Sequence, residues 1–400
     1  MVENFDVIIA GGGPAGLSVA RVASEIGAEV LLLELQAKVG QTQSSAWVSK
    51  EILDKEFNQA IKSSVDCVGI HSAHRNLEVE GNFGRIIDRE VFDRLLASEA
   101  VKAGVEIWVG APVRGLLNSD ERIQGVRTEA GEWSEEIESE VVVDATGAKT
   151  QWSSIFLREV LESGWDKEKI ARTNEYLMAN SLGEKRVDIY FNSFLAPQGH
   201  AWIYPLERDL SMAGIRGVRI HPDSALDEFI GRESPDRLRK SVPIGAYRGQ
   251  LPMEGPLERT TADGILAVGS SAGQVYPVSG HGMKYALKAG EIAGRIIAEG
   301  IKERDTSQDK LCEYDRLWRS KFEKEIRTGR MLRDSLQTSP DQKMNSLLEI
   351  LDKNEELRKY FVNMFLGEDL EKSIKEFFKI EKCRDVFGRN KVKKILDHYS

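Results

Sequence analysis

Short apolar runs separated by helical stretches dominate the beginning of the chain. Residues 6–10 predict a buried strand, because the apolar side chains are continuous rather than alternating. Apolar residues recur at helical spacing over 17–26, Gly27 ends that helix, and residues 30–34 form a second apolar run. This order predicts a βαβ unit with parallel strands.

The same alternation returns later in the chain. Its apolar runs predict strands at 105–109, 140–147 and 264–269, and its helical spacing predicts helices at about 89–103 and 282–299. A glycine turn follows each of the last two strands. We therefore expect one parallel sheet assembled from distant parts of the chain.

The middle and the end of the chain follow other patterns. Helical periodicity over 153–181 predicts a helical segment. Residues 186–191 and 201–204 alternate between turns that contain Pro and Gly, which predicts an antiparallel sheet. Residues 306–400 are rich in Glu, Lys, Leu and Arg at helical spacing and predict a helical region.

These elements predict an α/β fold with three parts, because 400 residues exceed one ordinary core. The parts are a Rossmann-like nucleotide-binding domain with a parallel sheet, an inserted antiparallel-sheet domain for the substrate, and a C-terminal helical region. The expected boundaries are 1–50, 83–150 and 256–305 for the first, 51–82 and 151–255 for the second, and 306–400 for the third.

Composition narrows the classes of function. With 41% hydrophobic and 30% charged residues the chain can bury a core, so it is folded rather than disordered. Its 64 acidic against 55 basic residues give a net charge of −9, which argues against a nucleic-acid partner. The three cysteines are far apart in the sequence and do not form a disulfide framework. The N-terminus does not have the pattern of a signal peptide, and no run approaches ~20 apolar residues. We therefore expect a cytoplasmic protein.

A glycine motif follows the first predicted strand. Gly11, Gly13 and Gly16 have the spacing GxGxxG, and Glu34 ends the second strand. The first glycine permits a tight turn, the second lets a pyrophosphate approach the backbone, and the third allows close helix–strand packing. Glu34 would accept hydrogen bonds from an adenosine ribose and disfavours a 2′-phosphate. The motif predicts a site for FAD or NAD, without deciding between them.

Five segments together resemble one flavoprotein family. They are Gly11–Gly16, Arg85–Arg94, Asp144–Gly147, His200–Pro205 (HAWIYP) and Val268–Gly282 (VGSSAGQVYPVSGHG). In order and spacing they are similar to the geranylgeranyl reductase family, within the flavoprotein group that includes p-hydroxybenzoate hydroxylase and flavin-dependent halogenases. The resemblance covers about residues 1–330 and implies FAD as the cofactor.

The resemblance also implies roles for single residues. Ala15 belongs to the dinucleotide site, Arg89 approaches the flavin, and Val113 lies beside the adenine. Gly282 and Met283 begin a helix whose N-terminus faces the pyrimidine end of the flavin. Such an N-terminus stabilises the negative charge of a reduced flavin.

The segment at residue 200 is similar to the family's Tyr-x-Trp-x-Phe-Pro signature beside the isoprenoid channel. Since alternate residues of a strand share a face, His200, Trp202 and Tyr204 should point together, with Pro205 next to them. An ordinary aromatic strand within a core is the alternative explanation. We expect a substrate wall.

The sequence departs from the family pattern at two places. Ser270 stands where the family has an Asp that contacts the ribityl chain, so a charge-assisted hydrogen bond is missing. In the stretch Gln43–Trp47, Ser45 and Ala46 replace a Cys-Gly pair beside the flavin. The bulk of Trp47 is expected to affect substrate selection there.

Two weaker signals concern catalysis and metals. His281 between two glycines is a candidate proton donor, although a neutral imidazole is expected at a helix N-terminus. Cys67, His71 and His74 lack a nearby fourth ligand, so we expect no metal site.

The resemblance implies an FAD-dependent reductase of carbon–carbon double bonds in an isoprenoid (geranylgeranyl-type) chain or lipid. Because no second GxGxxG follows a strand, the electron donor should be external: NAD(P)H, ferredoxin or a deazaflavin. A lipid substrate implies peripheral contact with a membrane. The alternatives are a flavin-dependent monooxygenase or halogenase of the same fold, and a degenerate flavoprotein that binds lipid or a partner without catalysis.

Overall fold

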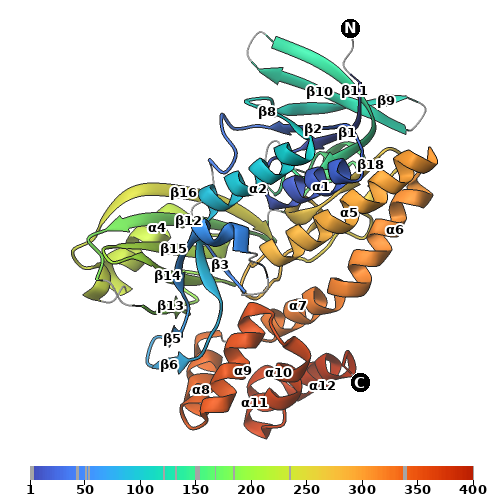
Figure 1. The fold of residues 1–400 in the computed structure, drawn as a ribbon. Coiled ribbons are helices and arrows are strands. Elements are labelled where there is room, and N and C mark those ends of the chain that lie inside the picture. Colours follow the sequence, from blue (N-terminus) through green and yellow to red (C-terminus); the bar gives the residue numbers. More distant parts are fainter. Residues whose placement is uncertain are drawn as a thin grey trace.

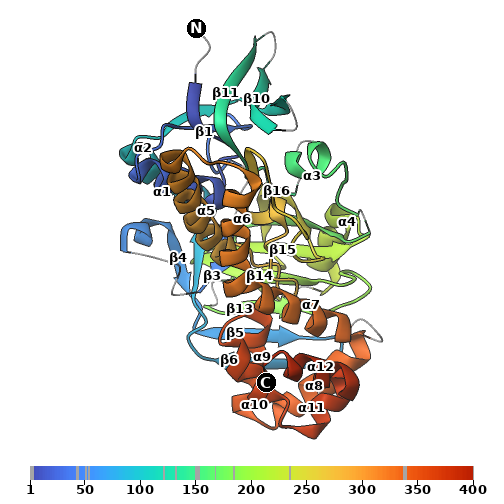
Figure 2. The same ribbon diagram turned by 90° about the vertical axis from the view of Figure 1, so that its right-hand side faces the viewer.

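A computed structural model describes most of the chain, with two sheets and a helical region stacked along one long axis (Figures 1 and 2). The described residues are 4–41, 45–49, 52, 55–119, 122–130, 133–148, 154–166, 168–182, 185–233, 236–336 and 340–399. None of the helices in these ranges is long and apolar enough to cross a bilayer.

The first sheet contains eight described strands, and its centre is parallel. The order β17-β18-β11-β1-β2-β8 runs across it, and β9 and β10 extend β11 as an antiparallel ribbon. β1 pairs in parallel with β2 and β11, as the βαβ pattern predicts. The strands are β1 (Asn4–Ala10), β2 (Val30–Glu34), β8 (Glu106–Val109), β9 (Val113–Ser119), β10 (Arg122–Ala130), β11 (Trp133–Asp144), β17 (Thr261–Ala262) and β18 (Ile265–Ala267).

Three helices lie together beside this sheet: α1 (Pro14–Glu25), α2 (Arg89–Ala103) and α5 (Met283–Glu303) (Figure 1). Glycines let α5 approach α1 closely. A Cβ added at Gly290 or Gly294 would come within 2.7 Å of the carbonyl oxygen of Ala15 or Val19. This contact joins a helix near residue 290 to the first helix of the chain, so the parallel-sheet unit is closed by a distant segment.

The second sheet has the order β16-β12-β15-β14-β13-β5-β6. Neighbouring strands of this sheet are antiparallel, as the sequence predicts, except β13 and β5, which are parallel. The strands are β5 (Cys67–His71), β6 (Asn76–Glu80), β12 (Ile170–Ala179), β13 (Val187–Tyr190), β14 (His200–Glu207), β15 (Leu210–Val218) and β16 (Val242–Pro252).

The helix expected over 153–181 is also wrong. Within the described residues only α3 (Ile155–Glu159) is helical there, and β12 occupies residues 170–179. β12 pairs along its length with β15 on one side and β16 on the other. The paired residues lie about 30–80 positions apart in the sequence, and pairing over this range overrides local periodicity.

Smaller elements complete the two-sheet part of the fold. A three-stranded sheet has the order β3-β7-β4. The bounds are β3 (Ser45–Val48), β4 (Ile61–Ser64), β7 (Arg85–Asp88), the 3-10 helices η2 (Lys55–Ala60), η4 (Asp236–Leu238) and η5 (Gly269–Ala272), the helix α4 (Pro222–Glu228) and the π-helical turn η3 (Phe229–Glu233).

The predicted C-terminal helices are confirmed. They are α6 (Gln308–Trp318), the π-helical turn η6 (Arg319–Glu323), α7 (Lys324–Leu336), α8 (Pro340–Asp352), α9 (Glu355–Leu366), α10 (Leu370–Phe377), α11 (Glu381–Phe387) and α12 (Arg389–Asp397). α6 and α7 run along the molecule, and the last five helices cluster beyond β5 and β6 (Figures 1 and 2). The fold class predicted from the sequence is confirmed. On this arrangement we propose the same three-part division of the chain.

Candidate active site

A cavity of about 430 Å³ lies where the parallel sheet meets the second sheet. Its wall includes most of the residues that the sequence singled out: Gly11, Gly13, Ala15, Glu34, Ala46, Trp47, Arg89, Val113, His200, Trp202, Tyr204, Ser270, His281, Gly282 and Met283. Gly16 and Pro205 lie outside its lining. Ser45 begins β3, but its side chain, like Gln43 and Ser44 as a whole, lies outside the described residues.

The glycine motif forms the turn between β1 and α1. Gly11 has φ +112°, and a Cβ there would lie 2.4 Å from the carbonyl oxygen of Ala145. A Cβ on Gly16 would lie 2.1 Å from the carbonyl oxygen of Gly11, so Gly16 serves packing rather than the cavity wall. A Cβ at Gly13 would meet no described atom within 4 Å. The backbone is therefore open to a ligand at the N-terminus of α1.

Glu34 closes this turn from the end of β2. Its carboxylate accepts hydrogen bonds from the backbone N–H of Gly12 at 2.7 Å and of Gln36 at 2.8 Å. Both oxygens keep lone pairs for further donors, and the residue lines the cavity. One carboxylate thus orders the glycine turn and offers acceptors to a ligand.

Arg89 enters the cavity wall from the start of α2. Asp88 caps this helix by accepting from the N–H of Val91 at 3.1 Å. The Arg89 guanidinium donates to the Asp93 carboxylate at 3.0 and 3.2 Å. Burial raises the pKa of Asp93, and Arg89 opposes that shift. The pair holds the guanidinium in place within the wall.

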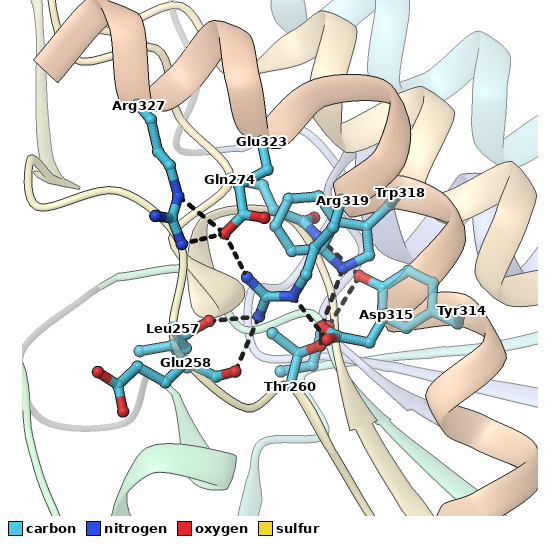
Figure 3. Close-up of polar contacts among 11 residues, drawn as sticks. Leu257, Glu258, Thr260, Gln274, Tyr314, Asp315, Trp318, Arg319, Glu323 and Arg327 are labelled. Carbon is cyan, nitrogen blue, oxygen red and sulfur yellow. Dashed lines mark hydrogen bonds and ion pairs between the residues drawn. The ribbon is translucent and has the colours of Figure 1, made fainter. Parts of the chain in front are cut away.

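Hydrogen bonds to helix α6 hold the loop that carries Ser270 in place (Figure 3). Gln274 accepts from the N–H of Gly269 at 2.7 Å and donates to the Tyr314 hydroxyl at 2.8 Å. The Tyr314 hydroxyl in turn donates to the carbonyl of Ala267 at 3.0 Å. All these bonds are buried, so the loop geometry depends on a residue more than forty positions away.

A second group of bonds in Figure 3 attaches the same helix to the preceding segment. Arg319 donates to Asp315 at 2.6 Å and to the backbone carbonyls of Leu257 and Glu258 at 2.6 and 3.0 Å. Asp315 also accepts from the Thr260 hydroxyl. The network ties the C-terminal helices to the segment that leads into the cavity loop.

The N-terminus of α5 forms another part of the wall. Gly282 is its N-cap, and no described side chain caps it. Burial, together with the nearby Arg216, lowers the pKa of His281 to about 4. His281 is therefore neutral at pH 7, and its ring lies edge-on to Trp47 with centroids 5.9 Å apart. A neutral imidazole is a poor proton donor, which weakens its candidacy.

An aromatic wall, made of Trp47, His200, Trp202 and Tyr204, covers one side of the cavity. The Trp202 and Tyr204 rings lie 5.9 Å apart and nearly parallel, at 28°. Trp47 meets Tyr204 edge-on at 6.2 Å. The three residues of β14 share a face, as their alternate spacing predicts. The adjacent Pro205 has a different contact, since its carbonyl accepts from the Ser63 hydroxyl at 2.7 Å.

Sequence reasoning missed several cavity residues from β12, β15 and β16. Arg216 is 1% exposed; it donates to the carbonyl of Val278 at 2.7 Å and has no carboxylate partner among the described residues. Its position within the apolar run of β15 was the signal that could have revealed it. Glu175 and Tyr247 were hidden by the mistaken helix assignment and by the distance between their strands.

The described residues contain no group of three or more His, Cys, Asp or Glu side chains placed to hold a metal ion. The site is built from glycine turns, helix N-termini, arginines and aromatic rings. This combination suits an organic cofactor with a pyrophosphate and a large apolar reactant.

Comparisons with known proteins agree with this geometry. A family model described as FAD dependent oxidoreductase matches residues 6–148. The digeranylgeranylglycerophospholipid reductase 1 of Methanopyrus kandleri is 31% identical over 382 residues, covering 92% of this chain and 99% of that protein. The digeranylgeranylglycerophospholipid reductase 2 of Methanococcoides burtonii is 29% identical over 366 residues, covering 87% of this chain and 88% of the relative.

Solved structures show the same fold. A geranylgeranyl bacteriochlorophyll reductase-like protein from Thermoplasma acidophilum has a TM-score of 0.78 at 22% identity, covering 94% of this chain and 99% of that one. A flavin-dependent brominase has a TM-score of 0.71 at 17% identity, covering 91% and 94%. At these identities the likeness concerns the fold alone.

The fold, the glycine turn and the matching family model define an FAD-dependent oxidoreductase. Its cofactor is FAD. Since similarity to the reductases extends over nearly the whole chain, the family is also settled: the chain belongs to the geranylgeranyl reductase family, to which the digeranylgeranylglycerophospholipid reductases belong. The resemblance noted from the sequence is confirmed.

Proposed function

We propose that this protein reduces carbon–carbon double bonds in an isoprenoid chain of the geranylgeranyl type, as a diphosphate or as part of a lipid. The observation that carries the proposal is one continuous cavity between the glycine turn and the aromatic wall. A cavity of this kind brings a dinucleotide cofactor to an apolar reactant. The names of the curated relatives support the same substrate class.

The residues of the cavity suit FAD. The open backbone at Gly13 and the N–H groups of the first turn of α1 would receive the pyrophosphate. Glu34 would accept from the ribose hydroxyls, and Ser270 would face the ribityl chain. The N-terminus of α5, at Met283, would favour negative charge on the flavin ring. When bound and reduced, FAD supplies a hydride from its N5.

The chain itself would orient the alkene and exclude water. Trp202 and Tyr204 are at most 8% exposed and offer ring faces to a hydrocarbon chain. Trp47 closes the wall from β3 and contacts Tyr204. The hydroxyl of Ser270 replaces a carboxylate, so we propose that FAD is held without a charge-assisted bond at that position.

An anaerobic turnover experiment tests this function. The purified holoenzyme is bleached with dithionite, and geranylgeranyl diphosphate or digeranylgeranylglycerophospholipid is added. Return of the flavin absorbance together with a product heavier by two hydrogens per double bond supports the proposal. The saturated chain serves as the control and should leave the flavin reduced. A strict need for oxygen would instead support a monooxygenase or halogenase.

We propose that electrons arrive from an external donor. NAD(P)H, ferredoxin and a deazaflavin remain the three candidates. Each is mixed anaerobically with the oxidised holoenzyme, and the loss of flavin absorbance is followed. The physiological class is the one that bleaches the flavin at least as fast as steady-state turnover.

We also propose peripheral contact with a membrane surface. Leu182, Val242 and Ile244 are 58%, 59% and 60% exposed. The last two belong to the edge strand β16, whose Tyr247 lines the cavity. Ile244→Asp should reduce co-sedimentation with lipid vesicles, whereas Val101→Asp, a change at an exposed residue of α2, should not. Equal binding by both variants would refute this surface.

A further inference from the structure

One carboxyl group of the cavity has no role in the function proposed so far. Glu175 lies on β12, in register with Gly214 of β15 and Tyr247 of β16. Gly214 is in turn the partner of Trp202 on β14. The four residues form a row across the second sheet, and Trp202, Glu175 and Tyr247 all line the cavity. The carboxyl therefore stands beside the aromatic wall.

Gly214 makes this arrangement possible. A Cβ at that position would lie 2.3 Å from Cε2 of the Trp202 indole. Because the side chain is absent, the indole can lie over β15, between β14 and the row position of Glu175. An aromatic surface and an acidic group thus share one face of the sheet, within reach of the same reactant.

The environment of Glu175 favours the protonated form of its carboxyl group. The residue is half-buried and lines the cavity. Its carboxyl makes no hydrogen bond or ion pair with any described residue. Burial raises the pKa of Glu175 to about 8, and the charge of Arg89 from α2 opposes this only in part. The phenols of Tyr204 and Tyr247 also face it. Arg216 lies two residues along β15 from Gly214, the residue that pairs with Glu175.

The histidine, tyrosine and arginine side chains of the cavity are poorer acids at neutral pH. Burial also raises the pKa of Asp93, but its carboxyl is engaged by the Arg89 guanidinium. Burial, Arg216 and His281 together lower the pKa of His200, and His281 has a pKa of about 4, so both imidazoles are neutral. Burial raises the pKa of the Tyr204 hydroxyl above its usual value. Burial lowers the pKa of Arg216 to about 10, which still leaves the guanidinium a much weaker acid at neutral pH. Glu175 is both protonated and able to release its proton near neutral pH, which general acid catalysis requires.

We propose that Glu175 is the catalytic acid that protonates the alkene during its reduction. The π bond of the alkene breaks. One carbon forms a C–H bond with the hydride of the reduced flavin, which is oxidised by two electrons, and the other carbon forms a C–H bond with the proton of the Glu175 O–H group. The carboxylate then regains a proton from water, and the external donor restores the reduced flavin. This step rests on the reductase function proposed above.

The test uses Glu175→Gln, which keeps the shape of the side chain but cannot donate an acidic proton. In anaerobic stopped-flow experiments the variant should bind FAD and be bleached by dithionite like the original protein. Its rate of flavin reoxidation by the polyprenyl substrate should fall by at least ~100-fold. Glu175→Asp should recover part of the rate, and Glu207→Gln, at an exposed carboxylate of β14 outside the cavity, should change nothing.

The pH profile supplies an independent readout that needs no variant. Reoxidation by the original protein should be constant below pH 7 and fall about tenfold per pH unit above pH 8, because the acid is lost. In Glu175→Gln the fall should disappear. A flat profile of the original protein, or an unchanged rate in the variant, would overturn the assignment of Glu175. If the original protein is not reoxidised by any polyprenyl alkene, the proposed function itself fails.

Discussion

The carboxylate of Glu34 offers the sharpest test of the nucleotide site. Its two oxygens accept from the N–H groups of Gly12 and Gln36 at 2.7 and 2.8 Å. Glu34→Gln keeps the side-chain volume but leaves one acceptor oxygen and places an NH₂ group toward a backbone donor. Glu34→Arg goes further, because it brings a positive charge to the positive end of helix α1.

The expected loss of FAD affinity follows from the number of hydrogen bonds that the substitution removes. A hydrogen bond to a charged group contributes ~1.5–3 kcal/mol, so loss of one such bond to a ribose hydroxyl should weaken FAD binding by roughly 10- to 150-fold. The disturbed bond to Gly12 adds to this loss, because the turn that receives the pyrophosphate becomes less ordered. Glu34→Arg should purify without FAD.

The assay is a titration of apoprotein with FAD, followed by quenching of flavin fluorescence. Thermal unfolding of the apoproteins shows whether the variants are folded. Glu29→Arg is the matched control, since Glu29 is an exposed residue just before the same strand. If Glu34→Arg binds FAD as tightly as this control does, Glu34 does not face the ribose and the assignment of the glycine turn is wrong.

Three further changes test other parts of the site. Ser270→Asp should bind FAD equally or more tightly in the same titration, since a carboxylate restores a charge-assisted bond; weaker binding would show that the loop is built around the serine. Gly214→Ala should lower the free energy of unfolding by ~1–3 kcal/mol, because the added methyl displaces the Trp202 indole; unchanged urea denaturation would contradict that contact. Tyr314→Phe should cost ~1–3 kcal/mol, since it leaves Gln274 and a backbone carbonyl without their partner; a cost near zero would mean that water replaces the hydroxyl.

Local pattern was sufficient for the elements whose character is set by neighbouring residues. The strand at 30–34 and the helix at 89–103 have the predicted bounds, because a continuous apolar run and a stretch with helical spacing are local signals. The prediction of a helix over 170–179 was wrong for the opposite reason. The ten residues of this segment lack a clear strand alternation, and pairing with two distant strands made them β12.

The sequence by itself determined the dinucleotide turn and the family. Gly11, Gly16 and Glu34 act within one βαβ unit, so their spacing carries most of their geometry. The tertiary structure alone brought Glu175 and Arg216 into the cavity, because sheet register joins residues that have no relation along the chain. The tertiary structure also determines the protonation behaviour of these side chains. Whether a carboxyl keeps its proton depends on desolvation and on neighbouring charges, and these exist only once the strands are paired.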